Sequence, residues 1–283
     1  MSMPPAASLR RARALPAVPG ASVLSVADVA LSYGQTMVLR DLALDVREGE
    51  MVALLGRNGA GKSTLLRLLS GVLAPQQGIV RLDGAPIGGL NRRAIARRLA
   101  VVPQQLQVPF AFNVREVTSL GRTAHVPFLA AESARDRAAV ADVLDLLDLT
   151  GLAERSYNTL SGGEQQRVVL AMALCQLWRQ PGILLLDEPT VHLDVAHQRA
   201  VLRLTRRLHD DREHGLTVLA AVHDLNMAAL YFDRLLLLKD GRLHADGPPW
   251  TVLTVEAIRD VFGVDARIAP HPTVDAPQVT LLP

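Results

Sequence analysis

Short runs of consecutive apolar residues recur along the chain, and each of them ends at glycines, glutamines or charged residues. The clearest runs are Met51 to Leu55, Ala100 to Val102, Ile183 to Leu186 and Thr217 to Val222. Apolar runs of this length without polar alternation are typical of strands buried on both faces of a parallel sheet. Because the residues from Val195 to His209 have helical spacing, the last two runs predict a strand, a helix and a second parallel strand.

The N-terminal part of the chain has a different pattern, in which apolar and polar residues alternate. Val23 to Leu31 and Val38 to Val46 alternate in this way, and a turn-forming segment around Gly34 separates them. Alternation on either side of a short glycine-containing turn predicts two antiparallel strands at the edge of a domain. Gly78 to Asp83 predicts a further strand.

Helical periodicity dominates the middle of the chain. Ala94 to Leu99 predicts a short helix, and Val168 to Leu177 predicts a longer one. Between them, about residues 106 to 160 form a helical insertion without strand signals. Further on, Asp240-Gly241 predicts the turn of a hairpin, which is followed by a short helix and a C-terminal tail at residues 265–283.

The composition is that of a globular protein and excludes a polar repeat or a disordered chain. Of the 283 residues, 49% are apolar and 20% are charged, and the net charge is only +2. The basic residues form no block dense enough for a nucleic-acid groove, so nucleic acid is not an expected partner. The single cysteine, Cys175, lies in an apolar helical pattern, which indicates a packing role and suits a reducing compartment.

No apolar run approaches the roughly 18 to 20 residues that a membrane-spanning helix requires, so we expect no membrane span. Residues 1–22 are rich in proline and alanine and carry an arginine cluster, but they lack the apolar segment of a secretory signal. We interpret them as a disordered N-terminal extension. An arginine-rich targeting peptide is the alternative.

A glycine-rich segment follows the apolar run that ends at Leu55 and fits the pattern G-x-x-x-x-G-K-[ST], between a predicted strand and a predicted helix. Such a segment binds phosphate, because its glycines let the backbone turn sharply and bring N–H groups to the phosphate oxygens. Lys62 can reach the β- and γ-phosphates, and the Ser63 hydroxyl can bind Mg²⁺. The segment comprises Gly56, Arg57, Asn58, Gly59, Ala60, Gly61, Lys62, Ser63 and Thr64.

Charged residues end two of the predicted parallel strands. Asp187 and Glu188 follow Leu186, and His223 follows Val222. Ionised carboxylates beside a buried strand need a partner, so Asp187 is a candidate Mg²⁺ ligand and Glu188 a candidate base for an attacking water. A helix-capping acid pair is the structural alternative. Taken alone, His223 would be a structural histidine, but its place after a strand makes it a candidate donor to the γ-phosphate.

Two further features are weaker when taken alone. Ser161, Gly162 and Gly163 precede a helix and can bind an anion with their N–H groups, although Ser-Gly-Gly also caps helices without any chemical role. Tyr33 follows the first predicted strand. Its ring either packs on a sheet edge or stacks on a purine base near the phosphate-binding segment, and the sequence leaves both alternatives open.

Taken in order, these motifs resemble those of the ATP-binding subunit of an ABC transporter, and the likeness covers about residues 23–264. The resemblance implies an α/β fold, with a P-loop NTPase core of the ABC type, a mixed central sheet, an antiparallel β subdomain and a helical insertion subdomain. It identifies Gln104 as the Q-loop residue, Leu160 to Glu164 as the signature and Leu193-Asp194 as the D-loop.

The same resemblance implies ATP hydrolysis by in-line attack of water, with ATP and Mg²⁺ as cofactors. Gln104 would join Ser63 and Asp187 around Mg²⁺, and Asp194 would belong to the nucleotide-binding residues. Two copies would form a homodimer, with each ATP between the P-loop of one subunit and the signature residues Ser161 to Gly163 of the other. The helical insertion would transmit dimer closure to a separate membrane permease, at the cytoplasmic face of the inner membrane.

A narrower likeness concerns the cargo. Val114 to Val117, His223 to Asn226 and Ala245 to Pro249 are similar to segments of the ATPases of importers for iron-siderophores, haem and cobalamin. This likeness implies an iron chelate as cargo and a periplasmic substrate-binding protein as an indirect partner. The alternatives are the ATPase of an ABC exporter and an ABC-type protein acting on ribosomes or DNA, which usually has a second cassette or a long coiled coil.

Overall fold

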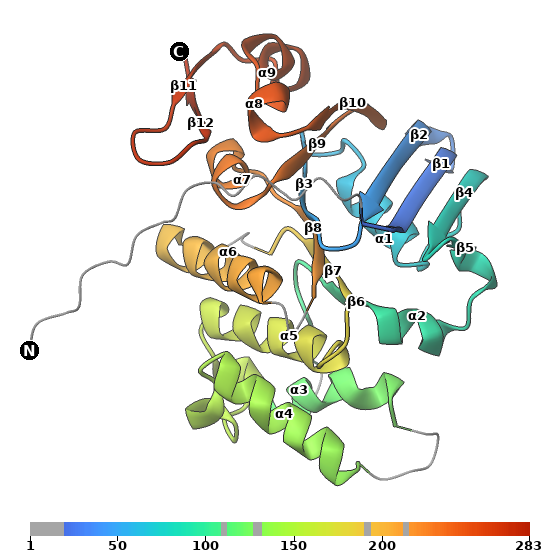
Figure 1. Ribbon diagram of the computed structural model, residues 1–283, viewed down its shortest axis with the longest axis vertical. Coiled ribbons are helices and arrows are strands. Elements are labelled where there is room, and N and C mark those ends of the chain that lie inside the picture. The colour runs from blue at the N-terminus through green and yellow to red at the C-terminus, as the bar shows by residue number, and fades with distance from the viewer. Residues whose placement is uncertain (1–19, 109–111, 127–131, 190–193, 212–214) are drawn as a thin grey trace, which may run out of the picture.

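The centre of the computed structural model is a six-stranded sheet (Figure 1). The structure describes residues 20–108, 112–126, 132–189, 194–211 and 215–283. The strands of the central sheet are Met51–Gly56 (β3), Leu99–Val102 (β6), Ile183–Asp187 (β7), Thr217–Ala221 (β8), Arg234–Lys239 (β9) and Arg242–Gly247 (β10). Their order is β10-β9-β3-β8-β7-β6, and all pairs are parallel except β10 with β9. The predicted mixed sheet is therefore confirmed.

Strand β3 is buried on both faces, as its unbroken apolar run predicts. Met51, Ala53 and Leu55 belong to one hydrophobic core, whereas Val52 and Leu54 belong to another. This division follows from the two-residue period of a strand, which directs successive side chains to opposite faces. The central sheet is therefore packed between two apolar layers.

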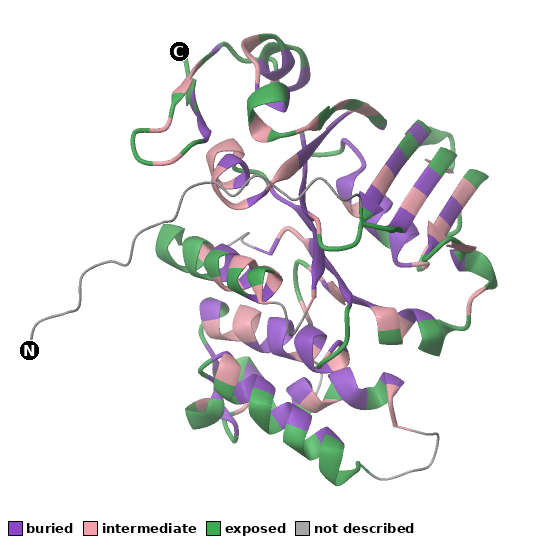
Figure 2. Cartoon of the chain, in the orientation of Figure 1, coloured by how far each residue is buried: buried purple, intermediate pink, exposed green. Residues whose placement is uncertain are grey.

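An antiparallel sheet and helix α1 (Lys62–Leu69) form one of these layers (Figures 1 and 2). This second sheet has the order β2-β1-β4-β5, in which the predicted hairpin turns at Gly34. Its strands are Ser22–Tyr33 (β1), Thr36–Arg47 (β2), Gln77–Leu82 (β4) and Ala85–Pro86 (β5). The antiparallel subdomain is thus present as predicted. A short 3₁₀ turn at Ile87–Gly89 (η1) and helix α2 (Arg92–Arg98) then lead into β6.

Helices α5 (Gly162–Gln176) and α6 (Val195–Asp210) contribute to the other layer. The helical insertion lies between β6 and α5 and occupies one end of the molecule (Figure 1). Its described elements are Val114–Ser119 (α3), Leu120–Ala124 (η2), Ala134–Leu146 (α4), Thr150–Leu152 (η3) and Tyr157–Thr159 (η4). All of these are helical, in agreement with the predicted insertion.

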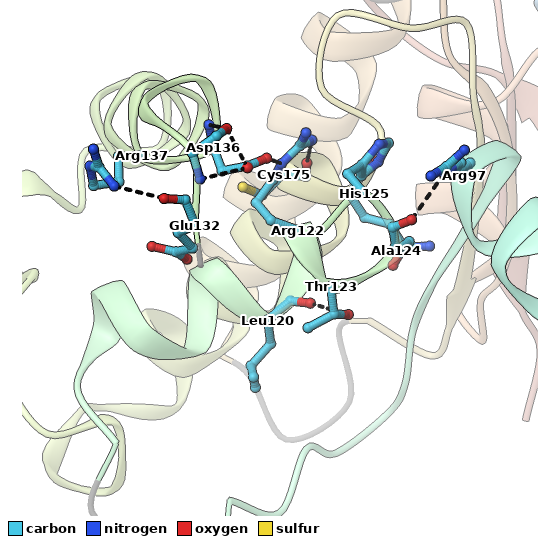
Figure 3. Close-up of polar contacts among 12 residues, drawn as sticks. Arg97, Leu120, Arg122, Thr123, Ala124, His125, Glu132, Asp136, Arg137 and Cys175 are labelled. Carbon is cyan, nitrogen blue, oxygen red and sulfur yellow. Dashed lines mark hydrogen bonds and ion pairs between the residues drawn. The ribbon is translucent and has the colours of Figure 1, made fainter. Parts of the chain in front are cut away.

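A buried ion pair lies within the insertion, and its arginine also binds α5 (Figure 3). Arg122 donates from Nε to Oδ1 of Asp136 at 2.9 Å and from Nη1 to the carbonyl oxygen of Cys175 at 2.8 Å. The other carboxylate oxygen of Asp136 accepts a hydrogen bond from the Ser133 hydroxyl at 2.6 Å. Cys175 itself is buried, which raises the pKa of its thiol to about 12 and leaves it the packing role that the sequence predicts.

The C-terminal part contains more structure than the sequence predicts. The hairpin of β9 and β10 turns at Asp240 and Gly241, as expected. Two short helices follow instead of one, Pro249–Val252 (α8) and Val255–Phe262 (α9). The predicted tail forms a two-stranded antiparallel sheet, Ala266–Pro270 (β11) and Pro277–Leu281 (β12). Burial of Val279 in the main core explains this extra sheet, because it gives so short a segment an apolar anchor.

Some predicted features lie outside the described residues. These are residues 1–19 of the N-terminal extension and Leu193 of the D-loop. Among the residues that are described, no helix combines the length and the apolar character needed to cross a membrane.

Candidate active site

The carboxyl ends of β3, β8, β7 and β6, which are adjacent in that order, meet along one edge of the central sheet. In an open α/β sheet, this edge is where the ligand crevice forms. A cleft of about 630 Å³ is lined by residues that follow all four of these strands and by residues of the antiparallel sheet. The lining residues are Tyr33, Val38, Asn58, Gly59, Gly61, Lys62, Ser63, Thr64, Gln104, Glu188 and His223.

The predicted phosphate-binding segment forms a tight turn between β3 and α1. Gly56 has a φ of 150°, and a Cβ at this position would lie 2.6 Å from the carbonyl oxygen of Leu238. Gly61 is the N-cap of α1, with a φ of 102°, and a Cβ there would lie 2.6 Å from the side chain of Leu39. A larger residue would thus meet both a strained backbone and an occupied space. The glycines keep the turn compact and leave its N–H groups near the cleft.

The other residues of this segment support the turn. Ala60 is buried, and its N–H donates a hydrogen bond to the carbonyl oxygen of Arg57 at 3.1 Å. Thr64 is also buried in the first turn of α1. Gly56, Arg57 and Ala60 do not line the cleft, so their contribution is to the shape of the backbone.

Lys62, the first residue of α1, has only 4% of its surface exposed. Its Nζ donates hydrogen bonds to the carbonyl oxygens of Gly56 at 2.9 Å and Arg57 at 3.3 Å. Nζ also lies 3.8 Å from Oε1 of Glu188. Burial lowers the pKa of Lys62, although the carboxylates of Glu188 and Asp187 oppose this shift. The ammonium group is therefore held beside the cleft by carbonyl oxygens of the turn.

Replacing Lys62 with alanine is expected to weaken ATP binding roughly 10- to 100-fold, because a hydrogen bond to a charged group contributes about 1.5–3 kcal/mol. Titration of the purified protein with a fluorescent ATP analogue measures the affinity. Arg67→Ala is the matched control, because Arg67 is an exposed cation on the same helix and does not line the cleft. Equal affinities of Lys62→Ala and the unmodified chain would contradict the assignment of the phosphate site.

Ser63 and Asp187 bring two oxygen ligands together. The Ser63 hydroxyl lines the cleft and donates to Oδ1 of Asp187 at 2.9 Å, while Asp187 itself lies behind it at the end of β7. Partial burial raises the pKa of Asp187, and the neighbouring Glu188 adds to this effect, whereas the bond from Ser63 opposes it. Gln104, just beyond β6, also reaches the cleft. These oxygen donors are of the kind that Mg²⁺ prefers.

Glu188 follows β7 with a φ of 51°, a left-handed conformation that residues other than glycine seldom adopt. Its N–H donates to the carbonyl oxygen of Ala221 at the end of β8, at 3.1 Å. Its Oε1 lies 2.6 Å from Nε2 of His223. Backbone strain of this kind concentrates at functional sites, where it fixes a side chain against its local preference. The carboxylate is thereby held between Lys62 and His223.

Tyr33 ends β1 with 48% of its surface exposed, and it lines the cleft. Packing on a sheet edge would have covered the ring. An exposed ring beside the phosphate-binding turn instead favours the alternative in which it stacks on a base. Val38, at the start of β2, is a lining residue that sequence reasoning missed, because nothing distinguishes it from the other apolar residues of an alternating strand.

The signature residues Ser161, Gly162 and Gly163 and the D-loop residue Asp194 do not line the cleft. Ser161 is the N-cap of α5 and forms a capping box with Glu164. Asp194 is the N-cap of α6, so the acid pair Asp187 and Glu188 does not cap this helix. The predicted nucleotide-binding residues therefore fall into two groups, one at the cleft and one at the starts of α5 and α6.

His197 joins the members of this second group. A Cβ on Gly163 would lie 2.5 Å from the His197 ring, so a larger residue there would displace the ring. Nδ1 of His197 lies 2.8 Å from Oδ1 of Asp194, and its backbone N–H donates to the same oxygen at 2.9 Å. The sequence alone assigns His197 no role at the site. His197 therefore lies between Gly163 of the signature and Asp194 at the start of α6, and it joins them in one surface.

A parallel strand that opens into a phosphate-binding turn beside an acidic strand end defines a P-loop NTPase. Comparison with known proteins narrows this class. The family model named ABC transporter matches residues 39–191, more than half of the chain. The hemin import ATP-binding protein HmuV of Pseudomonas entomophila strain L48 is 47% identical over 254 residues, which are 88% of this chain and 96% of that protein. The chain belongs to the ABC transporter family and is an ABC-type ATPase.

Solved structures agree with this assignment. An inward-facing ABC transporter of the metal-chelate type is 29% identical with a TM-score of 0.79, over 93% of this chain and 98% of that one. The dimeric structure of the bacterial ABC transporter cassette MJ0796 is 28% identical with a TM-score of 0.68, over 80% of this chain and 98% of that one. The fold predicted from the motifs is therefore confirmed.

Proposed function

We propose that this chain is the ATP-hydrolysing subunit of an ABC importer that takes up hemin through a separate membrane permease. The observation that carries the proposal is its 47% identity, over 254 residues, to a protein named for hemin import. The likeness to a metal-chelate type transporter supports the same class of cargo. Within the wider group expected from sequence, iron-siderophores and cobalamin are the competing cargoes.

In this proposal Lys62 and the backbone of the phosphate-binding turn hold the phosphates of ATP. Ser63, Asp187 and Gln104 would hold Mg²⁺, and they fit this ion because they offer oxygen donors, with Ser63 and Asp187 already in contact at 2.9 Å. When bound, Mg²⁺ neutralises charge on the phosphate oxygens. Tyr33 stacks on the base, and its exposed ring at the cleft supports this role.

Glu188 is the proposed general base for the water that attacks the γ-phosphate. Its contact with His223 at 2.6 Å fixes the orientation of the carboxylate, and the ammonium group of Lys62 lies 3.8 Å from the same oxygen. His223 can in turn donate a hydrogen bond toward the γ-phosphate. The three side chains come from different elements, so the geometry depends on the sheet that aligns them.

A head-to-tail homodimer would complete the site. The surface that carries Ser161, Gly162, Gly163 and Asp194 is separate from the cleft, so one subunit alone does not bring both groups to one nucleotide. Pairing by a twofold axis would place the signature of each subunit over the cleft of the other, which gives two equivalent sites. The dimeric form of the MJ0796 cassette supports this arrangement.

The proposal also assigns the parts of the chain. Residues 23–264 form the ATPase domain, and residues 106–160 form the helical subdomain that faces the permease. The chain would lie at the cytoplasmic face of the membrane through that contact, with a substrate-binding protein on the other side. The two-stranded sheet of β11 and β12 would then be an addition at residues 265–283.

The test is ATP hydrolysis by the complete transporter in lipid vesicles, with this chain, its co-purifying permease and a binding protein. We expect hemin-loaded binding protein to stimulate ATP hydrolysis. We also expect hemin to move to the side of the vesicle membrane on which this chain hydrolyses ATP. The same complex with Lys62→Ala controls for leakage. Stimulation by cobalamin or a ferric siderophore but not by hemin, or movement of hemin in the opposite direction, would contradict the proposal.

A further inference from the structure

The two-stranded sheet of β11 and β12, here called the C-terminal hairpin, contacts the helix that follows His223. Helix α7 (Leu225–Tyr231) begins two residues after His223, with Asp224 as its N-cap. The side-chain amide of Asn226, in the first turn, pairs with the backbone of Val279 in β12. Nδ2 of Asn226 donates to the Val279 carbonyl oxygen at 3.1 Å, and Oδ1 accepts from the Val279 N–H at 2.7 Å.

This contact is a two-point pairing of the kind that a neighbouring strand would make. A carboxamide offers one donor and one acceptor side by side, which matches the N–H and C=O of a single residue on a strand edge. Val279 is opposite Ile268 in the register of β11 and β12, and its own polar groups point away from that partner to Asn226. Asn226 thus fixes the free edge of β12 to α7.

The hairpin is also anchored by burial. Val279 is 6% exposed and belongs to the same core as Ala228 and Ala229 on α7. A hydrogen bond next to buried apolar contacts is shielded from competing water, so its geometry is well defined. The hairpin therefore supports α7 at the end nearest His223.

The opposite end of α7 is held independently. Nη1 of Arg206 donates to the carbonyl oxygen of Tyr231 at 3.3 Å and forms an ion pair with Asp233 at 2.9 Å. A helix of seven residues is too short to be stable without tertiary contacts, so the position of each end depends on what holds it. Loss of the Asn226 contact would leave the far end in place and release the end that carries His223.

We propose that Asn226, through its pairing with Val279, is a positioning residue for His223. This inference rests on the proposed role of His223 at the γ-phosphate. The segment from His223 to Asn226 includes Asp224, the N-cap of α7. Its carboxylate accepts hydrogen bonds from the N–H groups of Asn226 and Met227 at 2.8 and 2.9 Å. A shift of Asn226 therefore moves the cap, and with it the loop that holds His223 against Glu188.

The test measures kcat and KM for ATP in the full-length chain assembled with its permease. Asn226→Ala is expected to lower kcat about 10- to 100-fold, the cost of a misplaced group in a transition state, with little change in KM. Asn226→Asp keeps the acceptor for the Val279 N–H and should lose less activity. Gln278→Ala is the matched control, since Gln278 is the exposed neighbour of Val279 on the same strand.

A double-mutant cycle separates this inference from the proposed function. If Asn226 acts through His223, Asn226→Ala will have no further effect on kcat in the His223→Ala background. Independent, multiplicative losses would overturn the inference while leaving the role of His223 intact. A His223→Ala variant with unchanged kcat would instead overturn the proposed role of His223. Unchanged kcat in Asn226→Ala, with His223→Ala impaired, would also overturn the positioning role.

Discussion

Glu188→Gln should reduce the turnover of ATP by roughly 10² to 10⁴ while leaving ATP binding nearly unchanged, since this is the usual contribution of a general base. The amide has the size of the carboxylate, so it can occupy the same position between Lys62 and His223. It cannot accept a proton from water at neutral pH. The substitution therefore removes the general base but preserves the shape of the cleft. The rate of hydrolysis should fall while the affinity for ATP stays nearly the same.

Single-turnover hydrolysis and equilibrium ATP titration measure the two quantities in the same preparation. Glu256→Gln provides the matched control, because Glu256 is exposed on α9 and is not among the residues that line the cleft. Hydrolysis by Glu188→Gln at the original rate would remove Glu188 from the role of base. Loss of ATP affinity comparable to that expected for Lys62→Ala would show that Glu188 contributes to binding instead.

The residues of the cleft were predictable because they lie at the ends of strands. Gln104, Glu188 and His223 each follow an apolar run in the sequence, and parallel strands bring such positions to one edge of a sheet. The turn at Gly56 to Thr64 was also predictable. Binding a phosphate requires glycines where the backbone turns sharply and a lysine that can reach the phosphate oxygens, and this requirement fixes their spacing. Local patterns thus predicted most of the residues that line the cleft, although not Val38, and their shared location.

What the sequence does not give are contacts between elements that lie far apart along the chain. The 2.6 Å approach of His223 to Glu188 depends on the left-handed backbone at Glu188, which no local signal favours. The packing of His197 on Gly163 likewise depends on how α6 crosses α5. Residues 265–283 were expected to be a tail, and the burial of Val279 together with its pairing to Asn226 anchors them as a hairpin.

The ion pair of Arg122 and Asp136 is another contact of this kind, and its removal should have the largest effect on stability. Asp136→Ala is expected to lower the free energy of unfolding by about 3–5 kcal/mol, because it leaves the guanidinium buried without its counter-charge. The two side chains are only 8% and 10% exposed. Urea unfolding, followed by circular dichroism, measures the change through the transition midpoint.

The pH dependence follows from the same contacts. Hydrogen bonds from Ser133, and then from Arg122, lower the pKa of Asp136 below its usual value, although burial opposes them. A carboxylate with a lowered pKa stabilises the folded state above its unfolded pKa, and this contribution is lost as the pH falls through the folded value. The difference in stability between Asp136→Ala and the unmodified chain should therefore be full at neutral pH and shrink in acid.

Two controls test whether the loss of stability comes from the burial of this ion pair or from the loss of any ion pair. Arg115 and Glu154 lie in the same insertion at the same distance of 2.9 Å, but they are 49% and 72% exposed. Glu154→Ala should therefore cost no more than about 1 kcal/mol. Joint replacement, Arg122→Met with Asp136→Leu, should recover most of the loss, because a buried pair can be exchanged for apolar side chains at little net cost. Equal losses from Asp136→Ala and Glu154→Ala would show that burial does not govern this contact.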